Sequence, residues 1–351
     1  MAVSADAPFV YFVLVNYKGW ADTLACLESV FRSDYPHFAV LVCDNHSRNG
    51  SLAYIKEWAL GEREAEVDTT PTGLLGLVRP QVTKPLPVQE LAAEEAGEPG
   101  PPVAPGTLVL IQSLQNRGFA GGNNVGIRFA QTRGEFAYLW FLNCDTVVEP
   151  DALRQLIAYA GDRKAAGIKT GIIGATLRYY HQPERLQAIG GKYSKWLGTT
   201  RHLGAEEKDQ GQYLAFDPAG MDYVVGASML VSKAFLEEVG PMAEQYFLYF
   251  EELDWALRGR EKGWQLGFCP TCRVYHKEGG STGSGSKNQK SEFSDLYSLK
   301  NRVVLTRSFF PAYLPFVYLG FGGVFVNRIR RGQFGRALRI IKMLVRGEVT
   351  G

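Results

Sequence analysis

The chain has 351 residues, of which 46% are hydrophobic and 21% are charged. This composition excludes wholesale disorder, and the length suffices for one large core or a core with a smaller appendage. The net charge of +2 produces no strong overall field, which argues against a dedicated nucleic-acid-binding protein. Five cysteines, an odd number in so long a chain, do not indicate a disulfide framework.

The start of the chain alternates in the way that a β-α-β unit requires. Residues 9–15 are apolar and lead into Asn16, which predicts a buried strand, and residues 20–31 carry apolar side chains at helical spacing. A second apolar run, 38–43, stops at Asp44, and residues 51–60 favour another helix. We expect a parallel pair of strands joined by a right-handed crossover.

The composition changes between residues 61 and 106. This stretch contains eight of the 17 prolines and eight acidic residues, and its hydrophobic periodicity is weak. A long loop of this kind is uncommon inside a compact domain. We therefore predict that 61–106 is an inserted, poorly ordered segment.

Strand and helix patterns continue after the insertion. Apolar runs predict strands at 107–111, 136–142, 171–179, 223–231 and 264–276. A turn rich in glycine and amide side chains at 116–124 precedes a helix at 125–132, and further helices are expected at 150–159, 232–239 and 256–262. Residues 190–211 are polar, aromatic and typical of loops. This alternation predicts an α/β fold.

The C-terminal part has a different character. Residues 309–326 form an uncharged run of 18 residues, interrupted by Pro311, Pro315 and three glycines, whereas a membrane span needs about 20 apolar residues. Ten Lys and Arg residues, and no acid, lie between 296 and 347. This pattern favours attachment of a basic amphipathic helix to an anionic inner leaflet. A buried pair of C-terminal helices is the alternative.

Polar residues end several of the predicted buried strands. Open α/β sheets bind ligands outside the carboxyl ends of their strands, where Asp44, Asn143 and Asp145 are expected. Hard divalent cations prefer oxygen ligands and share them with phosphates. A carboxylate such as Asp145 could therefore hold a cation against a diphosphate.

Five stretches in this order, 13–17, 44–47, 116–124, 142–146 and 247–255, resemble the signature motifs of family 2 glycosyltransferases. The resemblance covers roughly residues 9–283 without the insertion, and it is greatest to the rhamnosyltransferase-like branch. It implies the GT-A nucleotide-sugar-binding fold, with a mostly parallel central sheet and flanking helices. It also implies a glycosyltransferase domain at 1–283. The apolar and basic composition of 284–351, and not the resemblance, predicts that this C-terminal helical region associates with a membrane.

The resemblance implies roles for the strand-end residues. Asp44 matches the family's base-recognising Asp, and Asp145 matches the metal-binding carboxylate of its Asp-x-Asp motif, with Asn143 in the first position. His276 matches a His that contacts the metal, Mg²⁺ or Mn²⁺, or the diphosphate. The remaining expected donor-binding residues are Asn16, Asn116, Gly121, Asn123 and Gly226. Because Asn lacks the charge of Asp, we expect modest metal affinity without the nucleotide.

An acidic cluster supplies the candidate catalytic base. Inverting transfer needs a carboxylate that removes a proton from the acceptor hydroxyl. The family motif favours Glu252 for this role, with Glu251 as the alternative, and an aromatic run before them predicts a partly buried setting that raises a carboxyl pKa. Asp254 and Trp255 are expected at the acceptor, although Trp255 could equally pack in the core. Residues 279–285 are predicted to form a loop that closes over the donor.

These patterns together predict a metal-dependent inverting glycosyltransferase. It would transfer a sugar, rhamnose being one candidate, from a UDP- or dTDP-sugar to a glycan or lipid-linked acceptor. The N-terminus lacks a basic signal region, so the cytoplasm is expected, at the inner face of the cell membrane. Two alternatives remain at this point: a nucleotide-sugar nucleotidyltransferase, and a non-catalytic membrane-associated carbohydrate-binding scaffold.

Overall fold

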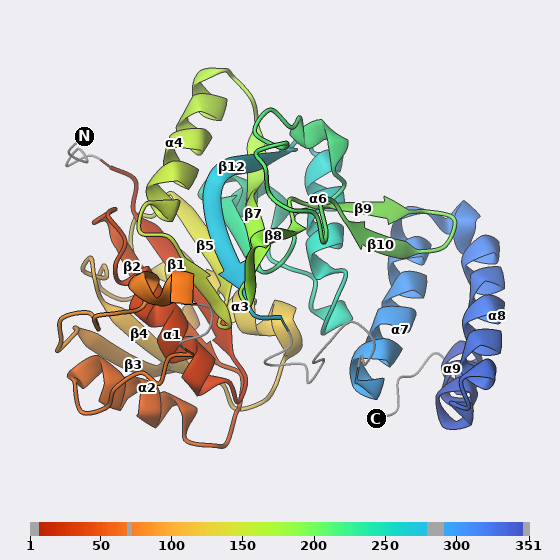
Figure 1. The fold of residues 1–351 in the computed structure, drawn as a ribbon, viewed down its shortest axis with the longest axis horizontal. Coiled ribbons are helices and arrows are strands. Elements are labelled where there is room, and N and C mark those ends of the chain that lie inside the picture. Colours follow the sequence, from red (N-terminus) through yellow and green to blue (C-terminus); the bar gives the residue numbers. More distant parts are fainter. Residues whose placement is uncertain (1–6, 69–71, 279–290, 347–351) are drawn as a thin grey trace.

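The computed structural model describes residues 7–68, 72–278 and 291–346. Within these residues ten strands form one mixed sheet, in the order β3-β4-β2-β1-β5-β11-β7-β12-β6, with β8 paired to β7 (Figure 1). The strands are β1 (Val10–Asn16), β2 (Phe38–Asp44), β3 (Val88–Ala92), β4 (Leu108–Gln112), β5 (Tyr138–Asn143), β6 (Thr146–Val148), β7 (Thr170–Tyr179), β8 (Gln182–Ala188), β11 (Ser228–Ser232) and β12 (Gln265–His276). A separate hairpin joins β9 (Gly191–Ser194) and β10 (Thr199–His202).

Helices cover both faces of the sheet. The helices of the described residues are α1 (Trp20–Val30), α2 (Ser51–Leu60), α3 (Gly118–Thr132), α4 (Ala152–Ala165), α5 (Lys233–Val239), α6 (Glu251–Glu261), α7 (Glu292–Phe309), α8 (Leu314–Arg330) and α9 (Phe334–Arg346). One hydrophobic core joins the sheet to α1, α2 and α4, and a second joins its other face to α3, α5 and α6. The predicted α/β class, with flanking helices on a central sheet, is confirmed.

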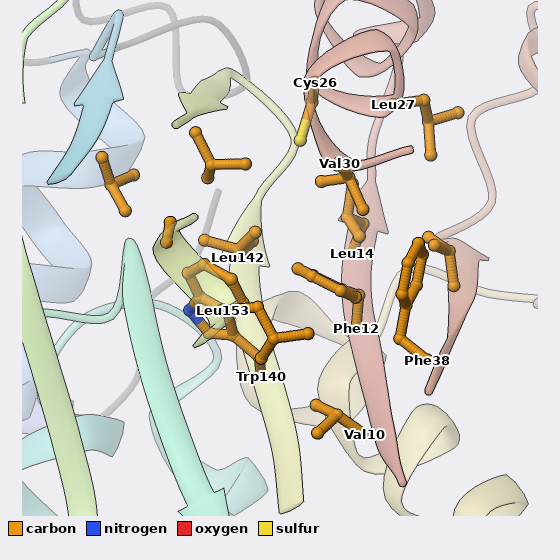
Figure 2. Close-up of a cluster of buried hydrophobic side chains, with 14 of the residues drawn as sticks. Val10, Phe12, Leu14, Cys26, Leu27, Val30, Phe38, Trp140, Leu142 and Leu153 are labelled. Carbon is orange, nitrogen blue, oxygen red and sulfur yellow. The ribbon is translucent and has the colours of Figure 1, made fainter. Parts of the chain in front are cut away.

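The parallel part of the sheet explains the apolar runs in the sequence. β1 lies between β2 and β5 and is parallel to both. On one face Phe12 and Trp140 are fully buried with their ring centroids 4.9 Å apart (Figure 2). On the other face Tyr11 packs edge-on against Phe129 of α3. Since both faces are covered, these strands have no solvent side on which polar residues could alternate.

Several predicted elements differ from the structure. Helix α3 begins at Gly118, so most of the predicted turn at 116–124 is helical. Residues 223–227, predicted as strand, precede β11, and the expected loop at 190–211 contains the β9–β10 hairpin. Glycine and asparagine residues have low helix propensity. In α3, however, 11 residues are buried, and this tertiary packing outweighs the preference of the local sequence for a turn.

The insertion at 61–106 is ordered in its described residues, so the prediction of poor order is wrong there. It carries the 3-10 helix η1 (Thr72–Leu77) and strand β3, which extends the sheet by pairing in parallel with β4. Leu74 and Val78 pack with Val147, Tyr180 and Tyr275 in a small buried cluster. Apolar contacts of this kind offset the conformational entropy that the proline-rich composition alone does not overcome.

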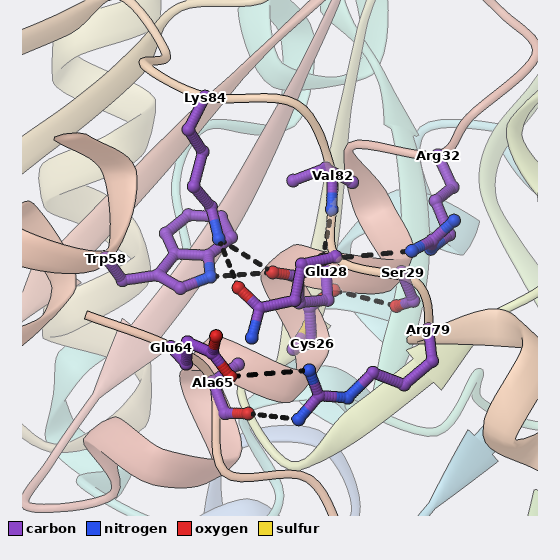
Figure 3. Close-up of polar contacts among 11 residues, drawn as sticks. Cys26, Glu28, Ser29, Arg32, Trp58, Glu64, Ala65, Arg79, Val82 and Lys84 are labelled. Carbon is purple, nitrogen blue, oxygen red and sulfur yellow. Dashed lines mark hydrogen bonds and ion pairs between the residues drawn. The ribbon is translucent and has the colours of Figure 1, made fainter. Parts of the chain in front are cut away.

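A buried carboxylate fastens this insertion to the core. Glu28 of α1 is fully buried and accepts hydrogen bonds from Trp58 Nε1 (2.8 Å), the Val82 backbone N (2.8 Å) and Lys84 Nζ (2.9 Å) (Figure 3). Lys84 also lies over the Trp58 ring, 4.4 Å from its centroid. A buried charge is stable only when it is paired and hydrogen-bonded, and Glu28 meets this condition through two residues of the insertion.

Helices α7, α8 and α9 pack side by side at one end of the molecule (Figure 1). Their shared core consists of Leu299, Val317, Phe321 and Ile340. Among the helices in the described part of the chain, none is long and apolar enough to cross a bilayer. The predicted domain boundary at 283/284 and the predicted closing loop at 279–285 lie outside the described residues.

Replacing Glu28 by Ala should lower the free energy of unfolding by about 3–5 kcal/mol, because it leaves Lys84 and the Trp58 N–H without their buried partner. Chemical denaturation measures this loss, and limited proteolysis should show earlier cleavage within 61–106. The matched control is Glu57→Ala on α2, which breaks a half-exposed pair with Arg63 and should cost less than about 1 kcal/mol. Equal losses in both variants would contradict the role given to Glu28.

Candidate active site

Asp44 stands at the end of β2, opposite Asn16 at the end of β1. It is 2% exposed and accepts hydrogen bonds from Asn16 Nδ2 (2.7 Å), Ser47 N (2.8 Å) and Gln112 Nε2 (3.0 Å). A carboxylate offers about four acceptor directions, so these three bonds fix its orientation and leave about one more. Asn16 therefore acts on Asp44 directly, since it holds the carboxylate that was predicted to read the base.

The next residue, Asn45, ties this strand end to the start of α3. Its Nδ2 donates to Asn116 Oδ1 (2.9 Å) and to the Gly118 carbonyl (2.9 Å), and its Oδ1 accepts from the Arg117 backbone N (2.9 Å). Asn45 was not among the predicted site residues, although its place directly after Asp44 was a signal. Through it, Asn116 lies at the same edge of the sheet as Asp44.

Two predicted donor-binding residues, Gly121 and Asn123, make contacts within helix α3. Asn123 Nδ2 donates to the Phe119 carbonyl (3.0 Å) one turn earlier. A Cβ on Gly121 would lie 2.3 Å from Arg117 Cβ, so a side chain does not fit there without a shift. Both residues shape the helix start, and their contact with a donor stays a prediction. Gly226 lies near Phe119, where a Cβ would meet the ring at 3.4 Å, an ordinary contact distance.

A second group of polar side chains gathers where β5 and β12 end. His276 Nε2 lies 3.1 Å from Asp145 Oδ1 and 3.2 Å from Asn143 Nδ2. His276 Nδ1 lies 2.9 Å from Gln187 Oε1 of β8, which holds the hydrogen on Nδ1 and turns Nε2 toward Asp145. Gln187 is buried and was missed from the sequence, because β8 was not predicted.

Electrostatics in this group favour a positive charge. Burial by itself lowers the pKa of His276, but the charge of Asp145 and its hydrogen bond outweigh burial and raise that pKa above its ordinary value. A divalent cation at this position would replace the shared proton, with Asp145 Oδ1 and His276 Nε2 as ligands. The donor set fits such an ion, and an acceptor that holds the other ring nitrogen, as Gln187 does here, is the usual support for a metal-binding His. In the described residues, no three His, Cys, Asp or Glu side chains form a metal-binding group.

The acidic pair begins helix α6. Glu251 is buried, and in the described part of the chain its Oε2 has no hydrogen-bond partner, whereas Glu252 is half-buried. Burial raises the pKa of Glu252 to about 7, against the opposing effect of nearby backbone N–H groups. Burial and then the charge of Glu252 raise the pKa of Glu251 well above its ordinary value. The raised pKa of Glu252 places its change of charge in the range where a general base works best.

The segment before the acidic pair has a strained backbone, and hydrogen bonds from α7 and α3 hold it in place. Phe247, Tyr249 and Phe250 all have positive φ (61°, 70° and 77°), which costs about 1–2 kcal/mol for each residue with a side chain. Asn301 of α7, fully buried, directs its Nδ2 at the carbonyls of Tyr246 (2.8 Å), Leu248 (2.8 Å) and Tyr249 (2.9 Å). Phe247 in turn accepts a bond from the Phe119 backbone N of α3 (2.7 Å).

The two predicted acceptor residues have structural surroundings. Trp255 is fully buried, donates from Nε1 to the Gly240 carbonyl (2.9 Å), and packs edge-on against Phe141 and Phe235. Of the two roles considered for Trp255 the structure shows core packing, so the expected acceptor contact is corrected. Asp254 accepts bonds from Tyr246 Oη (2.9 Å) and Arg258 Nε (2.5 Å), and an acceptor-orienting role for it stays a prediction.

Comparison with known proteins places this site in a family. A family model described as glycosyltransferase like family 2 matches residues 100–303, which is more than half of the chain. The chain belongs to this family. The matched part of this glycosyltransferase-like family 2 protein contains the β5 and β12 strand ends, the acidic pair and Asn301, and it begins after most of the insertion.

Individual relatives are distant. The low-salt glycan biosynthesis hexosyltransferase Agl10 of Haloferax volcanii is 23% identical over 203 residues, which are 57% of this chain and 60% of the relative. The crystal structure of GalNAc-T7 with UDP, GalNAc and Mn²⁺ has a TM-score of 0.55 at 14% identity, over 90% of this chain and 50% of that one. The mannosyltransferase PcManGT from Pyrobaculum calidifontis, in complex with GDP-Man and Mn²⁺, has a TM-score of 0.49 at 11% identity, over 96% and 81%.

The chain therefore spans less than two thirds of the curated relative's length. The likeness to GalNAc-T7 establishes the GT-A fold.

Proposed function

We propose that this protein is an inverting glycosyltransferase that moves a sugar from a nucleoside diphosphate to a hydroxyl acceptor. The observation that carries the proposal is the pairing of Asp145 with His276 at the edge where Asp44 also stands, on a GT-A sheet that brings an acidic pair to the start of α6. The names of Agl10, a hexosyltransferase, and GalNAc-T7, crystallised with UDP, GalNAc and Mn²⁺, support the same class of reaction.

Each group of the site then has a task in donor binding. Asp44, held by Asn16, accepts from the base or ribose of the donor, with a UDP- or dTDP-sugar as the proposed donor and rhamnose as the sugar that the sequence motifs favour. Asp145 and His276 hold a divalent cation, Mg²⁺ or Mn²⁺, which supplies charge neutralisation for the leaving diphosphate when bound.

The transfer itself is a single displacement. The acceptor hydroxyl oxygen forms a bond to the anomeric carbon while the bond from that carbon to the diphosphate oxygen breaks, and its electron pair leaves with the nucleoside diphosphate. Glu252 takes the hydroxyl proton. Attack from the face opposite the diphosphate inverts the anomeric configuration. A glycan or a lipid-linked sugar at the inner membrane surface is the proposed acceptor.

A thermal-shift screen tests donor binding. UDP-, dTDP- and GDP-sugars, each with and without Mn²⁺ or Mg²⁺, should include at least one that raises the melting temperature in the presence of metal, because a ligand that binds only the folded state stabilises it. Asp145→Ala should abolish the metal-dependent part of this shift. The proposal fails if no nucleotide sugar stabilises the wild-type chain with either metal.

The pH profile tests the catalytic base. With the pKa of Glu252 raised to about 7, turnover should rise as pH increases through about 7 and level off above it, since only the carboxylate accepts the proton. Glu252→Gln should reduce turnover by at least about 100-fold and keep the donor-induced thermal shift. The matched control, Glu261→Gln at the exposed end of the same helix, should retain turnover. Loss of turnover in Glu251→Gln with retention in Glu252→Gln would assign the base to Glu251.

A further inference from the structure

The C-terminal helices present an apolar surface that the fold does not use. On α8, Phe316, Leu319 and Val326 follow one another at helical spacing and are 43%, 74% and 47% exposed. On α9, Phe334, Leu338 and Ile341 repeat the same spacing and are 64%, 53% and 43% exposed. The inward faces of both helices already fill their shared core with α7. The outward side chains therefore form a largely exposed apolar patch on the described part of the chain, and a patch of this kind marks an interaction surface.

A distant part of the chain joins this surface. The tip of the β9–β10 hairpin carries Trp196 and Leu197, which are 56% and 52% exposed. The Trp196 ring lies 4.6 Å from the Phe316 ring and 5.0 Å from the Tyr313 ring, centroid to centroid, both edge-on. In Figure 1 the hairpin extends from the sheet toward the start of α8. We call these residues the apolar surface: Trp196, Leu197, Phe316, Leu319, Val326, Phe334, Leu338 and Ile341.

Positive charge accompanies the apolar surface. Arg330, Arg331 and Lys342 are exposed on α8, α9 and the turn between them, and the stretch from 296 to 347 contains no acidic residue. The two acids at the start of α7 are engaged: Asp295 binds Arg328 (2.7 Å), and Glu292 binds Arg339 (3.2 Å). Aromatic and aliphatic side chains beside basic ones form the combination that binds at an anionic lipid–water interface.

We propose that the apolar surface docks this protein onto an anionic lipid bilayer, with the β9–β10 hairpin tip as a second attachment point beside α8 and α9. A second copy of the chain is the competing occupant. A symmetric contact between two copies would bring the same basic residues together and would be opposed by their repulsion. Anionic headgroups remove this repulsion.

The hairpin also links this surface to the site, an extension that rests on the proposed function. Gly191 at the hairpin base pairs with Tyr223, and Gly191 N donates to the Tyr223 carbonyl (2.9 Å). Tyr223 packs in one buried cluster with Phe250 and Leu253, the residues on either side of the acidic pair. The hairpin thus joins the surroundings of the acidic pair to the apolar surface, which favours a lipid-linked acceptor.

Vesicle sedimentation of the full chain tests the docking. The wild type should sediment with vesicles of phosphatidylcholine and phosphatidylglycerol, less with phosphatidylcholine alone, and less at high salt. Leu319→Glu should weaken partitioning by about tenfold or more, and Trp196→Ser by about threefold or more, because each removes apolar area from the interface. The matched control is Leu214→Glu, a leucine that is 63% exposed elsewhere, which should stay within about twofold of wild type.

Several outcomes would overturn the proposal. One is that the wild type does not sediment with anionic vesicles, and another is that Leu319→Glu sediments with them as much as the wild type does. A third is that Leu319→Glu changes the oligomeric state, measured by light scattering, while neither protein binds vesicles. That result would assign the surface to a second copy of the chain. Vesicle binding requires neither donor nor acceptor. Its failure is therefore distinguishable from failure of the proposed glycosyltransferase activity.

Asn301 holds the segment before the acidic pair by hydrogen bonds from α7. This residue belongs to α7, outside the sheet, yet its Nδ2 lies 2.8–2.9 Å from three carbonyl oxygens of the strained segment 246–249. Its own Oδ1 is buried and has no hydrogen-bond partner among the described residues. An apolar side chain of similar volume would leave those carbonyls unbonded, so the amide serves the segment and not α7. The segment sets the direction in which Glu251 and Glu252 leave the start of α6.

We infer that Asn301 is a positioning residue for the acidic pair, an inference that rests on the proposed function. Asn301→Ala should lower kcat by about tenfold or more with KM for the donor within about twofold of wild type, because the base moves while the donor groups at β2 and β5 stay in place. The control is Thr306→Val on the same helix, equally buried, which loses only a contact with Tyr193 Oη (3.0 Å).

Hydrogen exchange supplies a readout that needs no activity. The backbone N–H groups of 247–251 should exchange faster in Asn301→Ala and at the wild-type rate in Thr306→Val, while both variants stay folded. Unchanged exchange in Asn301→Ala, or an equal acceleration in Thr306→Val, would overturn the inference. Exchange could change as expected although neither the wild type nor any variant turns over a nucleotide sugar. In that case the proposed function fails, but the conclusion that Asn301 positions the segment stands.

Discussion

The shared end point of β1, β2 and β5 governs where the polar groups of this site can stand. β1 runs between two parallel neighbours, and its register sets Asn16 opposite Asp44 and Val15 opposite Asn143. Strands that are covered on both faces can carry polar side chains only where they leave the sheet. A slip of one residue would turn Asn16 away from Asp44 and place apolar side chains at the ligand edge.

The acidic pair at the start of α6 is positioned by different contacts. It depends on a segment with three positive-φ residues, which α3 holds at Phe247 and α7 holds through Asn301. Strain of this kind persists only where the surrounding structure determines it. The burial that follows raises the carboxyl pKa values, so the same packing that orients the pair also prepares it for proton transfer.

The outer parts of the molecule are attached by specific contacts to this centre. The insertion reaches the core through Glu28, a charge satisfied only when Val82 and Lys84 are in place. The C-terminal helices reach it through α7, which contributes Asn301 to the acidic segment and Thr306 to Tyr193 of the hairpin. Elements that composition marks as peripheral are therefore in contact with the sheet and with the segment that carries the site.

The sequence by itself determined the α/β class, most of the strands and the strand-end residues Asp44, Asn143 and Asp145, because buried strands leave a local apolar run with an abrupt polar end. It also contained the motifs of the family to which the chain belongs. The tertiary structure alone decided that Gln187 supports His276, that Asn301 holds the acidic segment, and that Trp255 lies in the core. Gln187 and His276 are 89 residues apart in the sequence, and Asn301 and Tyr246 are 55 residues apart. Contacts over such separations follow from packing and leave no periodic signal along the chain.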